Sequence, residues 1–158
     1  MQRIPFGPTR FRKLLPPLAF FALLFCTRPA SAALGGDVAS IAADQALLAA
    51  SVSIVRAERY TMHELAAATG TKVREYLDSE GKVFAVTWQG PFRPNLRQLL
   101  GSYYETFLKA ADSRMSRGPL NISLPGLVIH MSGHQRAFYG RAYAADRVPQ
   151  GLSTDEIH

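Results

Sequence analysis

Cysteine is almost absent from this sequence of 158 residues, because the single one is Cys26. No cysteine follows it, which excludes disulfides, thiol catalysis and covalent haem attachment for the rest of the chain. The Gly-x-Ser-x-Gly and His-Glu-x-x-His signatures and glycine-rich phosphate loops are missing too. The common sequence marks of hydrolases, metalloproteases and nucleotide enzymes are therefore lacking.

A long hydrophobic run is also missing. The apolar stretch from Leu14 to Cys26 has 13 residues and contains two prolines, whereas a spanning helix needs about 20 apolar residues. Basic residues precede the stretch and Ala30-Ser-Ala32 follows it. This pattern predicts a Sec-type signal peptide over residues 1–32, cleaved between Ala32 and Ala33. We therefore expect a periplasmic or secreted protein with no stable membrane anchor after cleavage.

Acidic residues are absent from that leader. Five of the 18 Lys and Arg lie in residues 1–32, whereas all 12 Asp and Glu follow it, so the remainder carries a net charge of about +1. A nearly neutral domain lacks the clustered positive charge on which phosphate-backbone binding depends. The charge pattern therefore disfavours a nucleic-acid partner.

The remaining residues, 33–158, predict a single α+β domain: two helices packed on antiparallel β-meander sheets, in the order α-βββ-α-βββ. The first helix begins after Asp37 as an N-cap, and the segment 51–55 after it is ambiguous between a helix end and a short strand. Strands are expected over 60–65, 72–77, 82–89, 120–124, 127–131 and 136–143. The tail from about residue 149 is expected to be frayed.

The segment after Pro94 predicts the second helix. Asn95 and Gln98 have the spacing of a capping box, and Leu99, Leu100 and Phe107 recur at helical spacing. We expect this apolar stripe to be buried.

Histidines give the nearest approach to a metal or catalytic pattern. His130 and His134 flank Ser132-Gly133, which predicts a hairpin turn with a two- or three-residue loop. No cysteine or nearby carboxylate completes a ligand set, so we predict no metal site and no cofactor. On the strand 60–65, His63 and Glu64 point to opposite faces, while Glu64 and Glu75 are candidates for one shared face.

Aromatic and arginine side chains are the candidate binding residues. Phe92 and Arg93 lie in a proline-rich connector, and such residues often anchor interfaces, although an ordered connector explains them as well. Tyr139, Arg141 and Tyr143 alternate along one strand, which predicts a ligand-facing row, although cross-strand packing explains them equally.

Several motifs together resemble an exported bacterial family catalogued as domain of unknown function 2844. They are Ala33-Leu-Gly-Gly-Asp37, Tyr60-Thr-x-His-Glu-Leu65, Val73-Arg-Glu-Tyr76, Val83-Phe-Ala-Val-x-Trp-Gln-Gly-Pro91, Leu96-Arg-Gln-Leu-Leu-Gly101 and Gly133-His-x-Arg-Ala-Phe-x-Gly-Arg-Ala-Tyr143. The resemblance assigns no activity, cofactor or catalytic residue to any position. A looser architectural likeness is to periplasmic modules of the beta-lactamase-inhibitor-protein and PepSY types, which bind proteins.

These observations favour a non-catalytic binding or interaction module, with an envelope protein or envelope component as its partner. One alternative is a small periplasmic enzyme that uses His63 or His130 with a carboxylate brought close by folding. The other is a small-ligand binder with a cavity lined by Tyr139, Tyr143 or Trp88. Whether the chain is an enzyme stays open, the sequence favours no catalysis, and no oligomeric state follows from it.

Overall fold

The computed structural model describes residues 34–113 and 118–158, so the predicted leader and the Ala32–Ala33 bond lie outside the described ranges. The elements are α1 (Val38–Leu48), β1 (Ser51–Arg56), β2 (Thr61–Ala66), β3 (Lys72–Leu77), β4 (Val83–Gly90), α2 (Leu96–Leu100), the 3-10 turn η1 (Gly101–Tyr103), α3 (Tyr104–Asp112), β5 (Leu120–Leu124), β6 (Leu127–His134), β7 (Ala137–Tyr143) and the 3-10 turn η2 (Thr154–Glu156). The expected α+β class is confirmed, in the order α-ββββ-α-βββ when α2, η1 and α3 are taken as one interrupted helix.

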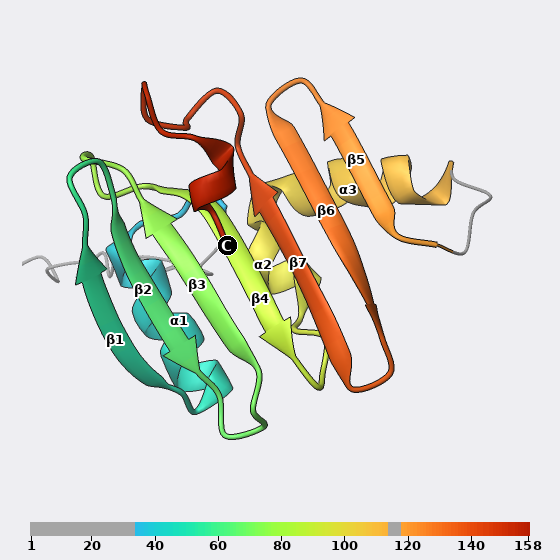
Figure 1. Ribbon diagram of the computed structural model, residues 1–158, viewed down its shortest axis with the longest axis horizontal. Helices are drawn as coiled ribbons and strands as arrows, with labels where there is room; N and C mark the ends of the chain where they lie inside the picture. The colour runs from blue at the N-terminus through green and yellow to red at the C-terminus, as the bar shows by residue number, and fades with distance from the viewer. Residues whose placement is uncertain (1–33, 114–117) are drawn as a thin grey trace, which may run out of the picture.

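The seven strands form one antiparallel sheet in the order β1-β2-β3-β4-β7-β6-β5. Each half of the chain forms a meander, and the final strands of the two meanders, β4 and β7, pair at the centre (Figure 1). Strands that are far apart in the sequence therefore become neighbours in the middle of the sheet.

The strand β1 resolves the ambiguity of the segment after the first helix. Ala49 takes a left-handed conformation, with φ of 44°, and ends α1 immediately before the strand. The strand pairs only with β2, at the edge of the sheet, and most of its side chains are exposed. The alternation of polar and apolar residues covers only Ser51 to Ile54 before Val55 breaks it, and a pattern this short does not distinguish a strand from a helix end.

All three helices cover one face of the sheet, called here the helix-covered face (Figure 1). Leu99, Leu100 and Phe107 are buried in the main hydrophobic cluster beneath them, as expected. Gly101, with φ of 49°, interrupts the predicted second helix. Among the described residues, no helix has the length and apolar character needed to cross a membrane.

The N-cap of α2 forms as expected, but only half of the capping box is present. The side-chain oxygen of Asn95 accepts a hydrogen bond from the amide of Gln98 at 3.3 Å. The side chain of Gln98 does not return to Asn95; its Nε2 donates to Oδ1 of Asp44 in α1. A tertiary contact between two helices thus replaces the local one.

The opposite face, called here the open face, carries the C-terminal segment (residues 151–158), which lies across the strands in Figure 1. The expectation of a frayed tail was wrong. Ser153 and Glu156 form a capping box around η2, and Ile157 has no exposed surface. Ile157 packs with Phe84 and Tyr76 in a second hydrophobic cluster, and such burial fixes a segment too short to hold its shape alone.

Two predicted hairpins are confirmed and one is wrong. Gly81 and Gly126 take positive φ in the β3–β4 and β5–β6 turns. The strand β6 continues through Ser132-Gly133 to His134, which pairs with Ala137, so the turn is Gln135-Arg136. Gly133 instead permits a close approach of two backbones, because an added Cβ there would lie 2.2 Å from the carbonyl oxygen of Ala137.

Candidate functional site

The open face is hollowed by a groove of about 610 Å³, bounded at one end by the C-terminal segment. Its lining residues are Lys72, Arg74, Thr87, Trp88, Gln89, Pro119, Asn121, His130, Met131, Ser132, Tyr139, Gly140, Arg141, Ile157 and His158. They come from β3, β4, β5, β6, β7, the residue before β5 and the C-terminal segment. Both halves of the chain therefore build the groove, across the β4–β7 junction.

Strand register places one row of polar residues across the groove. Neighbouring strands pair them in the order Glu64, Arg74, Thr87, Arg141, His130 and Asn121. Directly opposed residues in adjacent strands have side chains within contact distance on one face of the sheet. The row forms only because β4 pairs with β7, which joins its first three members to its last three.

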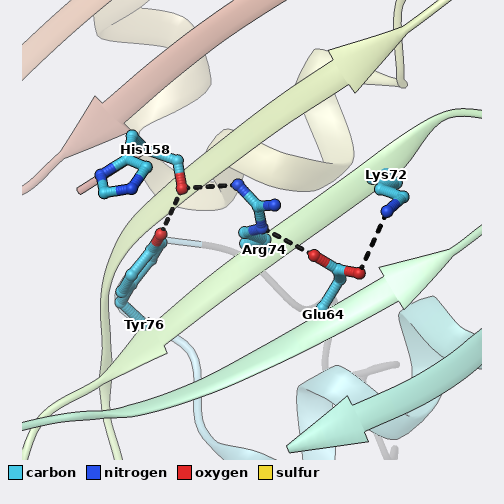
Figure 2. A network of polar contacts seen from close by, with 5 residues as sticks. All are labelled: Glu64, Lys72, Arg74, Tyr76 and His158. Atoms are coloured by element: carbon cyan, nitrogen blue, oxygen red, sulfur yellow. Dashed lines mark hydrogen bonds and ion pairs between the residues drawn. The ribbon is translucent and has the colours of Figure 1, made fainter. Parts of the chain in front are cut away.

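An ion-pair network fixes one wall of the groove (Figure 2). Glu64 accepts a hydrogen bond from Nε of Arg74 at 2.7 Å and lies 3.5 Å from Nζ of Lys72. The hydrogen bond from Arg74 is the main reason why the pKa of Glu64 is lowered; burial has the next largest effect and opposes it. Glu64 holds the two cationic side chains in place, although it does not line the groove itself.

Cationic side chains also hold the C-terminal segment over the sheet. Nη1 of Arg74 and the hydroxyl of Tyr76 both donate to the backbone carbonyl of His158, each at 2.7 Å (Figure 2). Nη1 of Arg141 donates to the carbonyl of Thr154 at 3.0 Å. The segment is thereby fixed as the end wall of the groove.

His130 lies at the centre of the β6 wall. Its Nδ1 shares a hydrogen bond with Oδ1 of Asn121 at 2.9 Å. Burial, and secondly the positive charge of Arg141, lower the pKa of His130 below its usual value of 6.5, which favours the neutral imidazole. His130 therefore offers the groove a neutral hydrogen-bonding ring.

The groove has a one-sided charge. Its lining includes Lys72, Arg74 and Arg141 but no Asp or Glu. A carboxylate that could orient His130 or exchange a proton with it is therefore missing from the lining. This set of side chains can bind and orient an anionic group.

A second polar cluster lies on the helix-covered face. Asp44 and Glu75 have no exposed surface, and Glu75 is paired in register with His63. Burial and the neighbouring Asp44 raise the pKa of Glu75 to about 8, while burial, and secondly the charge of Arg56, lower that of His63. The cluster brings a histidine and carboxylates together, but the buried position of Glu75 keeps it from solvent.

The five candidate binding residues separate into two groups. Tyr139 and Arg141 line the groove, whereas Tyr143, on the same strand, packs against the second hydrophobic cluster. Phe92, which is 60% exposed, and Arg93 do not line it; the guanidinium of Arg93 lies 4.9 Å from the ring centre of Phe138.

Two further pairings from the sequence have clear outcomes. Glu64 and Glu75 do not share a face, because Glu64 pairs with Arg74 on the open face while Glu75 is buried beneath the helices. His63 and Glu64 point to opposite faces, as expected for adjacent strand residues. Within residues 34–113 and 118–158, no three His, Cys, Asp or Glu side chains are grouped so as to hold a metal ion.

The basic side chains of β3 were missed by sequence reasoning. Lys72 and Arg74 alternate in that strand and face the same side as Glu64, which is a detectable pattern. Their proximity to Arg141 and His130 depends on the β4–β7 pairing, and no local pattern specifies that pairing.

The family comparison supports the resemblance seen in the motifs. A family model described as "Protein of unknown function (DUF2844)" matches residues 30–157, which include every helix and strand described above. No curated protein and no solved structure matches the chain.

Proposed function

The chain belongs to the DUF2844 family, and we propose that it is an exported, non-catalytic binding protein whose ligand occupies the groove on the open face. The observation that carries this proposal is the groove itself: a hollow of about 610 Å³ lined by three cationic side chains and no carboxylate. Volumes of about 300 to 1,000 Å³ are typical of small-molecule sites. The groove therefore supports a ligand of small-molecule size.

One of the three residues named for a ligand cavity supports this choice. Tyr139 lines the groove and is 56% exposed, whereas Trp88 borders it but is 3% exposed and packs in the main hydrophobic cluster. Aromatic side chains supply much of the contact area in binding sites. An enzymatic role has less support, because His130 has no carboxylate beside it in the groove and His63 faces a Glu75 that solvent does not reach.

Export is the second part of the proposal and rests on residues 1–32. The basic start, the 13-residue apolar stretch and the Ala30-Ser-Ala32 triplet form the pattern of a cleaved leader. We place the protein in the periplasm or outside the cell, where a binding protein meets envelope components and solutes.

The test is to fill the groove and look for loss of a bound ligand. Ser132→Trp places a large side chain in the groove, and Ser53→Trp makes the same change on β1 of the open face, away from it. We expect native mass spectrometry of protein purified from its host envelope to detect a small ligand on wild type and on Ser53→Trp but not on Ser132→Trp. Equal ligand occupancy in the two variants would exclude the groove as the binding site.

A further inference from the structure

The side chains of the groove carry more information on its ligand than its size does. Lys72, Arg74 and Arg141 supply positive charge, and Glu64 pairs with the first two of them. Arg141 stands opposite both Thr87 and His130 in the register, at the middle of the polar row. Because Glu64 neutralises Lys72 and Arg74, Arg141 is the cation of the groove with most positive charge left for an anion.

Arg141 retains donors for a ligand. Its guanidinium has five N–H groups, and one hydrogen bond is made through Nη1 to the carbonyl of Thr154. The remaining N–H groups present the planar geometry that recognises carboxylate, sulfonate or phosphate oxygens. The neutral ring of His130 and the hydroxyl of Ser132 lie on the neighbouring strand as further polar contacts.

The exposed apolar part of the groove is formed by Pro119 and the half-exposed ring of Tyr139. Met131 and Ile157 border it but are 9% and 0% exposed. Such a surface gains free energy by removing apolar ligand area from water. It fits a ligand with a hydrophobic or aromatic body better than a fully hydrated inorganic ion.

We infer that the groove binds a small organic anion, with the anionic group against Arg141 and the apolar body against Tyr139; this inference rests on the proposed function. The nearly neutral charge of residues 33–158 argues for a single anionic group rather than a polyanion. Free solutes and lipids both carry such anionic groups, and we commit to the free solute because the groove is bounded by the C-terminal segment.

A pair of dyes tests the inference. 8-Anilinonaphthalene-1-sulfonate has an aromatic body and a sulfonate, and N-phenyl-1-naphthylamine has the same rings without the sulfonate. Trp88 is the single tryptophan and borders the groove, so energy transfer from Trp88 reports bound dye, and the variants below assign that dye to the groove. We expect the sulfonate dye to bind about tenfold more tightly than the neutral dye, because hydrogen bonds to charged groups are stronger than those to neutral groups.

Variants separate charge from shape. Arg141→Gln is expected to weaken binding of the sulfonate dye about tenfold and to leave binding of the neutral dye unchanged. Arg141→Lys should recover part of the lost affinity. Tyr139→Ala is expected to weaken binding of both dyes. Arg147→Gln is the matched control, since Arg147 lies outside the groove. Circular dichroism checks that Arg141→Gln is folded. If it is not, Lys72→Gln replaces it, because Lys72 is half-exposed, and we expect binding of the sulfonate dye to weaken about threefold.

Equal affinities of the two dyes, or sulfonate binding that is unchanged in Arg141→Gln, would overturn the anion assignment. If Ser132→Trp still removes the native ligand in that case, the binding function stands and only the ligand class is wrong. Arg141-dependent binding to phosphatidylglycerol vesicles, without binding of the sulfonate dye, would assign the site to a lipid headgroup and overturn the free-solute choice.

Discussion

Asp44 of α1 and Glu75 of β3 bring two carboxyl groups together in the interior, and neither residue has any exposed surface. Gln98 of α2 donates a hydrogen bond to Asp44, so the pair also connects the two helices. Two buried negative charges would lower the stability of the folded state, and a proton retained on Glu75 removes one of these charges. This arrangement makes the stability of the protein depend on pH.

The first prediction concerns Glu75→Gln. Burial and Asp44 raise the pKa of Glu75 from 4.5 to about 8, so the folded protein holds a proton that the unfolded chain releases above about pH 4.5. The contribution of this group to the free energy of unfolding is fully present below about pH 4.5 and is lost as the pH rises through about 8. Glutamine has no such proton to lose. We therefore expect the free energy of unfolding of the variant, relative to wild type, to rise between pH 5 and pH 9 by several kcal/mol.

Urea denaturation at pH 5, 7 and 9 measures this difference. Glu105→Gln is the control, because Glu105 is largely exposed and pairs with Arg97 at 3.7 Å. His63 and His130 have lowered pKa values and act with the opposite sign, but they are common to all three proteins and cancel in the comparison. A difference between Glu75→Gln and wild type that stays constant with pH would contradict the retained proton.

The second prediction concerns the buried stripe of α2. Leu99 and Leu100 are 2% and 0% exposed, so Leu99→Ala and Leu100→Ala should each lower the free energy of unfolding by about 2 to 5 kcal/mol. Leu47 of α1 is 71% exposed, and Leu47→Ala provides the matched control with a change within about 0.5 kcal/mol. Denaturation midpoints that are the same for all three variants would refute the burial.

The third prediction concerns the contact between Gly140 of β7 and Trp88 of β4. An added Cβ at Gly140 would lie 2.3 Å from Cζ2 of Trp88, too close for the ring to stay in place. Gly140→Ala should therefore destabilise the fold by about 1 to 3 kcal/mol. Because Trp88 is the single tryptophan, its emission reports the site directly. An unchanged emission maximum together with an unchanged melting temperature would show that the ring has room to move.

The fourth prediction concerns export. We expect fractionation of the native host to recover the protein outside the cytoplasm, and N-terminal sequencing to give Ala33 as the first residue. Replacing Ala30 and Ala32 with bulky residues should block cleavage, since signal peptidases require small side chains at these positions. Recovery of uncut protein in the cytosol of wild-type cells would contradict the proposal.

The strands and helices that were predicted correctly from the sequence are those whose apolar residues recur with the period of a strand or of a helix. The strand β5 and the buried stripe of α2 are examples, because their burial follows local alternation or helical spacing, whereas β4 is an apolar run with six consecutive buried residues. The edge strand β1 was ambiguous because edge burial is slight. The hairpin at Ser132-Gly133 was misplaced because glycine there permits a close backbone approach rather than a turn.

The candidate site was predicted in part. Tyr139 and Arg141 were identified from alternation along one strand, and both line the groove. Lys72 and Arg74 were not, because they reach the same groove through the pairing of β4 with β7. Long-range strand order depends on the packing of the whole sheet, which no local window of sequence contains.

The contacts of Leu152 and Ile157 with Phe84 also bear on how the molecule is made. These contacts join residues that follow the sheet in the sequence to strands synthesised much earlier, and the bond from Tyr76 to His158 spans 82 positions. Until the ribosome has added Leu152 and Ile157, Phe84 and Tyr76 lack their covering and expose apolar surface. A product terminated before Leu152 would keep that surface exposed and would be a preferred target for chaperones and proteases.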